Sequence, residues 1–191
     1  AMKPNRLRAL VSVESLMEDL DIIENSAVTI LDIKEGLIGP ARQRTDAVVS
    51  LSEMIRSTVV NMGLPDGIVE MEWADNMPNV FVDARQVEQV FNNLIKNSWE
   101  ALSQTPSPKI VVTGLRDRDP NFVLVTVQDN GPGISKAIQE KIWVSFFTTK
   151  GGSGGTGLGL SACVQIVNQH GGSISLESES GKGAMFSVRL P

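Results

Sequence analysis

Asn93-Leu-Ile-Lys-Asn97-Ser-Trp-Glu100 is the stretch that decides the fold, because three further blocks follow it in a fixed order. The next block is Asp129-Asn-Gly-Pro-Gly-Ile134, and the last two are Phe147-Thr-Thr-Lys150 and Gly155-Thr-Gly-Leu-Gly-Leu160-Ser161. Each block alone is a weak signal, since polar helix faces, glycine turns and glycine-rich loops are common. As an ordered set, they predict one nucleotide pocket.

The composition limits the chain to one ordinary core with an appendage. Its 191 residues, 41% of them hydrophobic, suit a single core of about 130 to 150 residues. A net charge of −5 without a Lys/Arg cluster argues against nucleic acid as a partner. No apolar run approaches the ~20 residues that cross a bilayer, so we expect no membrane contact by this fragment. The single cysteine, Cys163, excludes a disulfide framework and fits a cytoplasmic location, and a membrane anchor elsewhere in a longer protein stays open.

Residues 1–62 are predicted to be mainly helical. From Val13 to Leu37, apolar residues recur at steps of three and four, which indicates a narrow coiled-coil-like seam that needs a partner helix. Glycine and proline residues just beyond this seam end the helix. Ser50 and Glu53 then form a capping-box pattern at the start of a short second helix.

Residues 63–191 alternate between strand and helix patterns. The expected strands cover 68–73, 80–82, 110–113, 122–128, 173–179 and 184–190, and the expected helices cover 84–103 and 157–170. We expect the strands to pair mainly as hairpins. The pattern predicts the α+β class, a two-layer α/β sandwich with helices on one face of a mixed sheet, preceded by an N-terminal helical segment.

Asn93, Asn97 and Glu100 follow one another at helical spacing, so they share one face of the helix expected over 84–103. Two asparagines one turn apart present two neutral carbonyl oxygens to a common point, which suits Mg²⁺ that also binds phosphate oxygens and water. An ordinary solvated face is the alternative. Asparagine is a poor helix former, and a merely wet face would be built more stably from Lys, Glu or Gln.

Asp129 comes directly after an apolar strand and precedes two glycines, Gly131 and Gly133. An ordinary turn explains these glycines equally well. A calcium loop is excluded because a single carboxylate is present where several are needed. The functional interpretation is that Asp129 accepts a hydrogen bond from the exocyclic amine of adenine, while the glycines let the backbone approach the ring.

The glycine-rich stretch from Lys150 to Ser161 passes directly into an apolar helix, which a flexible linker would not do. Leu160 stands where a Walker loop needs lysine, and the strand and spacing of a dinucleotide loop are missing. We therefore expect a lid whose last glycines begin a helix, with backbone N–H groups facing the phosphates. Lys150, with Thr148 and Thr149, adds donors, although a solvated lysine is an equal alternative.

The four blocks resemble the N, G1, F and G2 boxes of the ATP-binding catalytic domain of sensor histidine kinases. That domain belongs to the superfamily of gyrase, the heat-shock chaperone ATPases and the mismatch-repair ATPases. The resemblance covers residues 68–191, and Phe146-Phe-Thr-Thr-Lys150 is especially similar to the nitrogen-sensing type. It implies a Bergerat-type ATP-binding fold that takes ATP and Mg²⁺.

The resemblance also implies roles for individual residues. Asn93 and Asn97 would bind Mg²⁺, and Asn93 and Lys150 are the candidates for a catalytic role. In the hydrolytic relatives a water-activating glutamate usually stands at the position of Asn93, and an amide cannot act as a general base. The implied nucleotide-binding set is Asn93, Asn97, Glu100, Asp129, Gly131, Gly133, Ile134, Phe147, Thr148, Thr149, Lys150, Gly155, Thr156, Gly157, Leu158, Gly159 and Leu160.

One part of the family pattern is missing. Kinases of this kind phosphorylate a histidine in a His-Glu or His-Asp motif, whereas the only histidine here, His170, precedes two glycines at an expected helix end. We interpret His170 as a helix-terminal residue beside a glycine cap. The acceptor is then either upstream of Met2 in a longer protein or naturally absent.

We therefore expect two domains. Residues 1–62 would hold the second helix of a dimerisation hairpin and a linker helix, and residues 63–191 the ATP-binding catalytic domain. The expected function is transfer of the ATP γ-phosphoryl to a histidine absent from this chain, and thence to a response regulator receiver domain. The full-length protein would be a homodimer. The alternatives are a nucleotide-gated binding module and a hydrolytic ATPase of the same superfamily.

Overall fold

The computed structural model describes residues 13–150 and 155–191, so the centre of the expected lid, 151–154, lies outside the described residues. The elements in chain order are α1 (Val13–Ile38), β1 (Asp46–Val49), α2 (Leu51–Asn61), β2 (Val69–Trp73), β3 (Val80–Asp83), α3 (Ala84–Ala101), β4 (Ile110–Arg116), β5 (Val123–Asp129), α4 (Lys136–Gln139), the 3-10 turn η1 (Lys141–Trp143), α5 (Gly159–Gln169), β6 (Ser173–Ser178) and β7 (Ala184–Leu190).

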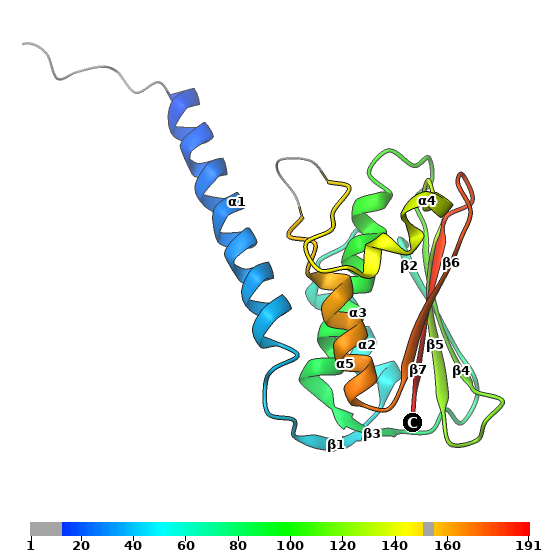
Figure 1. The fold of residues 1–191 in the computed structure, drawn as a ribbon. Helices are drawn as coiled ribbons and strands as arrows, with labels where there is room; N and C mark the ends of the chain where they lie inside the picture. The colour runs from blue at the N-terminus through cyan, green and yellow to red at the C-terminus, as the bar shows by residue number, and fades with distance from the viewer. Residues whose placement is uncertain (1–12, 151–154) are drawn as a thin grey trace, which may run out of the picture.

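The body of the molecule has two layers, with α2, α3 and α5 on one face of a five-stranded sheet (Figure 1). The strand order is β2-β4-β5-β7-β6, in which β2 and β4 are parallel and every other pair is antiparallel. The expected two-layer sandwich with a mixed sheet is therefore confirmed. The two expected hairpins, β4 with β5 and β6 with β7, are present.

Three details of the expected fold were wrong or missing. The strands expected at 68–73 and 80–82 lie in different sheets, because β3 pairs antiparallel with β1 in a separate two-stranded sheet. Strand β1 was not predicted, since four residues are too short a segment to show a clear period. The short α4 and η1 segments were also not predicted.

The core lies between α3, α5 and the inner face of the sheet. Strands β5 and β7 alternate between buried and half-buried residues, as expected for strands with one covered face. Helix α3 is amphipathic and buries Val90, Phe91 and Leu94 completely, while Asn93, Asn97 and Glu100 line a cavity on its polar face. Because α3 is fixed along its whole length, the side chains on its polar face have defined positions.

Helix α2 begins at the predicted cap, where Ser50 Oγ accepts a hydrogen bond from Glu53 N over 3.5 Å. It contributes Leu51 and Ile55 to the same core as α3. The domain boundary expected at 62/63 stays a prediction, and α2 packs with the residues that follow that boundary.

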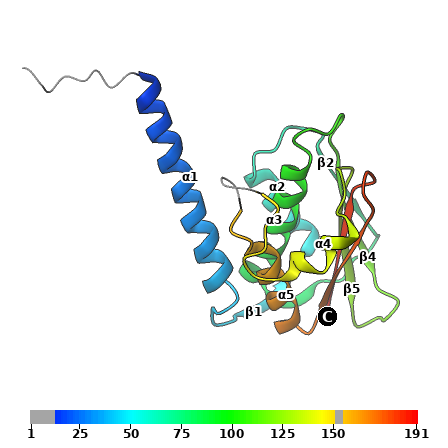
Figure 2. The ribbon, with the colours of Figure 1, turned by 45° about the horizontal axis from the view of Figure 1, so that its top comes forward.

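Helix α1 leaves the body and most of its length stands apart from the other elements in both views (Figures 1 and 2). The apolar residues of its seam, among them Leu20, Ile23 and Ile30, are more than half exposed. No helix in the described part of the chain is both long and apolar enough to cross a membrane. The expectation that this seam packs against a partner helix stays a prediction.

The N-terminus of α3 is held by Asp83 and His170. Asp83 is the N-cap, and its Oδ1 accepts hydrogen bonds from Arg85 N (3.0 Å) and Gln86 N (3.1 Å). His170 is the C-cap of α5, and its Nε2 accepts from Asp83 N over 3.1 Å while its Nδ1 lies 2.8 Å from Ile166 O. Both ring nitrogens are therefore engaged, and the interpretation of His170 as a helix-terminal residue is confirmed.

We expect Asp83→Ala to lower the free energy of unfolding by about 2 kcal/mol at neutral pH, because an N-cap and the acceptor of a part-buried Thr45 N–H are lost together.

Burial alone would raise the pKa of Asp83, but hydrogen bonds from Thr45, Gln86 and Arg85 outweigh it and hold the pKa below 3.8. A carboxyl with a lowered pKa stabilises the fold above its unfolded value and loses this effect as the pH falls through the folded value. Urea unfolding should therefore show the difference between wild type and variant shrinking as the pH falls below 3.8. The same change at exposed Asp75 should have little effect, and a pH-independent difference would contradict the assignment.

Candidate active site

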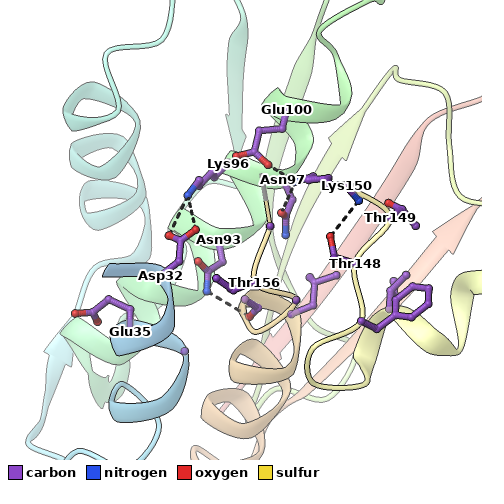
Figure 3. Close-up of a pocket in the computed structure, with 17 residues that line it drawn as sticks. Asp32, Glu35, Asn93, Lys96, Asn97, Glu100, Thr148, Thr149, Lys150 and Thr156 are labelled. Carbon is purple, nitrogen blue, oxygen red and sulfur yellow. Dashed lines mark hydrogen bonds and ion pairs between the residues drawn. The ribbon is translucent and has the colours of Figure 1, made fainter. Parts of the chain in front are cut away.

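Asn93, Asn97 and Glu100 lie on the polar face of α3 and line a cavity whose other wall is the loop between η1 and α5 (Figure 3). Spacings of four and three residues bring their side chains to the same side of the helix. The prediction that these three residues meet at one place is therefore confirmed.

Asn93 is held in one orientation by α5. Its Nδ2 donates to Gly159 O over 3.3 Å and lies 3.8 Å from the Sγ of Cys163. Burial raises the pKa of the Cys163 thiol to about 12, so this sulfur is an uncharged neighbour. Since the nitrogen of the amide is engaged, its Oδ1 is the atom available to a ligand in the cavity.

The loop side of the cavity is fixed to the start of α5. Phe146 N donates to Gly157 O over 2.9 Å, and both residues have positive φ, 67° and 68°. A Cβ on Gly157 would lie 2.5 Å from the carbonyl carbon of Phe146, so glycine is required at this close approach. Helix α5 has Leu158 as its N-cap without a side-chain hydrogen bond, which leaves the first backbone N–H groups to other acceptors.

Lys150 reaches across the cavity to α3. Its Nζ pairs with Glu100 Oε2 and lies 3.4 Å from Asn97 Oδ1, and its backbone N donates to Thr148 Oγ1 over 3.1 Å. This side chain contacts two of the predicted site residues while 39% of it stays exposed, so its role at the site stays a prediction.

Most of the predicted binding residues meet in this cavity. Those that line it are Asn93, Asn97, Glu100, Phe147, Thr148, Thr149, Lys150, Gly155, Thr156, Gly157, Gly159 and Leu160. The cavity has a volume of about 150 Å³. Its hydroxyls, amides, lysines and helix N-terminus suit phosphate groups.

Sequence reasoning missed five lining residues, Asp32, Glu35, Gly36, Lys96 and Ile142. Three of them belong to the last turns of α1, which was expected to serve only as half of a hairpin. A Cβ on Gly36 would lie 2.5 Å from that of Leu158, so α1 and α5 approach closely there. Lys96 lies between Asn93 and Asn97 in the first block. This position in the sequence could have indicated that Lys96 also lines the cavity.

Asp129 is not among the residues that line this cavity. Its Oδ1 accepts from Gly131 N (2.9 Å) and Ala184 N (3.3 Å), and its Oδ2 accepts from Ser98 Oγ (3.3 Å). Burial raises the pKa of Asp129, although these three hydrogen bonds act in the opposite direction. The contact with Ser98 joins this buried carboxyl to α3, the helix that also carries Asn93 and Asn97.

The other predicted residues outside the cavity make structural contacts elsewhere in the domain. Gly133 has φ +70°, and a Cβ there would lie 2.1 Å from Glu179 O. Ile134 N donates to Ser178 Oγ over 2.8 Å, and Leu158 is 2% exposed. Gly131 turns the chain directly after Asp129. Their contact with an adenine ring stays a prediction.

The oxygen atoms that line the cavity are suitable ligands for a hard divalent cation. No cluster of three or more His, Cys, Asp or Glu side chains within the described ranges could hold a metal. The amide oxygens of Asn93 and Asn97, with Glu100 one turn further, are neutral and anionic oxygen ligands of the kind that Mg²⁺ binds alongside phosphate oxygens. The residues present therefore suit Mg²⁺ bound together with a nucleotide.

Known proteins with similar sequences share this domain. The family described as histidine kinase-, DNA gyrase B- and HSP90-like ATPase matches residues 82–191. The sensory histidine kinase/phosphatase NtrB of Escherichia coli O157:H7 is 30% identical over 187 residues, which cover 93% of this chain and 53% of NtrB. This chain thus spans about half the length of that relative.

Solved structures agree with the sequence comparison. The catalytic domain of histidine kinase ThkA in a nucleotide-free form has a TM-score of 0.64 and 33% identity, covering 78% of this chain and 96% of that domain. Histidine kinase ThkA in complex with the response regulator protein TrrA has a TM-score of 0.72 and 27% identity, covering 96% of this chain and 53% of the kinase chain. A match over more than half of the chain, together with the ordered site on α3 and α5, shows that this chain belongs to the histidine kinase-, DNA gyrase B- and HSP90-like ATPase family and carries its ATP-binding domain.

Proposed function

We propose that residues 63–191 are the ATP-binding catalytic domain of a two-component sensor histidine kinase. The domain would transfer the γ-phosphoryl of ATP to a histidine outside this chain. The observation that carries this proposal is the amide of Asn93, which is tied through Nδ2 to Gly159 O and presents only Oδ1 to the cavity. An amide oxygen can bind a metal but cannot take a proton from water, so the site favours a protein acceptor over hydrolysis.

The proposal gives each of these residues a role. Asn93 and Asn97 would hold Mg²⁺, which neutralises charge on the phosphates when bound. The uncapped start of α5 and Lys150 would add donors to the same phosphates. Asp129 would accept a hydrogen bond from the adenine amine. Phosphoryl transfer passes through a loose transition state, so positioning and charge neutralisation are the main tasks of such a site.

The partners follow from the same reaction. The phosphoryl group would pass from the histidine to an aspartate of a response regulator receiver domain, and the similarity to a ThkA–TrrA complex supports this class of partner. Helix α1 would be the second helix of a dimerisation hairpin, so the full-length protein would be a homodimer. The reaction uses cellular ATP, and we therefore place this region in the cytoplasm.

Labelled ATP provides the test. We expect the chain, mixed with γ-labelled ATP, Mg²⁺ and a separately made dimerisation hairpin of NtrB, to label the hairpin with an acid-labile, base-stable phosphoryl group typical of phosphohistidine. The hairpin with its acceptor histidine replaced by glutamine should stay unlabelled. Measurable ATP binding without any label on the intact hairpin would contradict the kinase assignment and favour a nucleotide-gated binding module. Steady release of phosphate without a hairpin would favour a hydrolytic ATPase.

A further inference from the structure

Lys96 and Asp32 form an ion pair that joins α1 to the cavity. The Nζ of Lys96 lies 3.1 Å from Oδ1 and 3.2 Å from Oδ2 of Asp32, and both residues line the cavity (Figure 3). Each side chain is 36% exposed. A pair with this exposure contributes little to stability and breaks readily when a better partner is present.

The charges of the cavity are unusual for a site that takes a polyanion. Its charged lining residues are three acids, Asp32, Glu35 and Glu100, and two lysines, Lys96 and Lys150. Each lysine is already paired with one of the acids, Lys96 with Asp32 and Lys150 with Glu100. The lining side chains thus hold one more acid than lysines, and the acids contributed by α1 repel a triphosphate and oppose the attraction of Mg²⁺ and of the start of α5.

Of the described part of α1, the last turns are held by the body, through the packing of Gly36 against Leu158 and through polar contacts. Gln89 Nε2 donates to Glu35 O over 2.6 Å, and Gln86 Nε2 donates to Gly39 O over 3.1 Å. These contacts place Asp32 within reach of Lys96. The earlier part of α1 is exposed. Asp32 therefore lies near the point where the helix leaves the body, and breaking its ion pair would weaken the attachment of the helix there.

We propose that Lys96 is a phosphate-binding residue whose partner in the absence of a triphosphate is Asp32. The terminal phosphates of ATP and the end of α1 then compete for one ammonium group. The phosphates carry more negative charge than a single carboxylate, so nucleotide binding loosens α1 from the cavity. This inference rests on the proposed function, because it requires that the cavity takes the phosphates of ATP.

Binding of ATP and of adenosine to four forms of the 191-residue chain separates the possibilities. We expect Asp32→Asn to bind ATP about two- to fivefold more tightly than wild type, since a competitor for Lys96 is removed. Lys96→Gln should bind ATP about 10- to 100-fold more weakly, and adding Asp32→Asn to it should give only the small gain that follows from removing one acid from the cavity. Adenosine, which lacks phosphates, should bind all of these forms equally.

Glu35→Gln is the matched control, because Glu35 also lines the cavity from α1 but has its ion pair with Lys34, 3.6 Å away, rather than with α3. It removes the same charge from the same helix, so its gain in ATP affinity should be smaller than that of Asp32→Asn and should persist in the Lys96→Gln background. An equal gain in ATP affinity for Asp32→Asn and Glu35→Gln would show that both acids merely repel the phosphates. That result would overturn the proposal that Asp32 and ATP compete for Lys96.

Hydrogen exchange gives a readout of α1 itself. We expect ATP, but not adenosine, to speed exchange of the amides in residues 30–39 of wild type, and to have little effect on them in Asp32→Asn. If ATP binds wild type, Asp32→Asn and Lys96→Gln with the same affinity, the inference fails while the proposed function stands. If none of the forms binds ATP, the proposed function fails as well.

Discussion

If Asp129 binds the adenine amine as proposed, Asp129→Asn should weaken ATP binding by about 10- to 100-fold or more, because that charge-assisted hydrogen bond would be lost. The variant keeps the fold for a geometric reason. Its Oδ1 can still accept from Gly131 N and Ala184 N, and its Nδ2 can donate to the Ser98 hydroxyl, which now rotates to accept. The same Nδ2 group would face the adenine amine, another donor, so the variant loses recognition rather than structure.

The stability of this variant provides an independent check. Burial raises the pKa of Asp129 above 3.8, so the ionised carboxylate is costly to the fold. A carboxyl with a raised pKa lets stability fall as the pH rises through its folded value. Asp129→Asn removes this titration and should be at least as stable as wild type at neutral pH. Unchanged ATP affinity in a folded Asp129→Asn would overturn the assignment of the base site, and exposed Asp75→Asn should change neither property.

Asn93→Asp should reduce phosphotransfer from Mg·ATP by at least about 100-fold. The new carboxylate has no N–H group for Gly159 O, so the two oxygens now 3.3 Å apart repel each other. It also adds a negative charge to a cavity that already has more acids than lysines. Both effects disturb the position of the oxygen that would bind Mg²⁺, and a misplaced phosphate loses the alignment on which transfer depends.

Asn92→Asp is the matched control for this change. It introduces the same charge one position earlier on α3, at a residue that does not line the cavity. Label transferred to the acceptor hairpin and ATP affinity should both be close to wild type in Asn92→Asp and both low in Asn93→Asp. If Asn93→Asp gains steady release of phosphate from ATP, the introduced carboxylate acts as a base for hydrolysis. Equal losses in the two variants would mean that charge on α3, rather than the amide of Asn93, controls the site.

The amino-acid sequence predicted the layers, both hairpins and most of the cavity, because these depend on local period and on ordered motifs. Asn93, Asn97 and Glu100 could be placed together since helical spacing alone brings them to one face. Lys150 was harder, because its contact with Glu100 spans a loop whose path no local pattern specifies.

Features that depend on long-range packing could not be predicted. Asp32 and Lys96 are separated by 64 positions, and nothing in either neighbourhood indicates that α1 ends against α3. The pairing of β3 with β1 rather than with β2 was missed for a similar reason, since β3 and β2 are close in sequence and read as a pair. Asp129 was predicted to be a pocket residue. Its hydrogen bond from Ser98 depends on how β5 packs against the end of α3, which no local pattern indicates.

The order of the sheet determines when this domain can fold during synthesis. Strand β7 lies between β5 and β6, and in this sheet it is the partner of β6. A nascent chain that has emerged only as far as β6 therefore has α3 and α5 but an incomplete sheet beneath them. The ribosome must release residues 184–190 before the nucleotide pocket has its supporting layer, so this domain should mature after translation of its last strand rather than progressively.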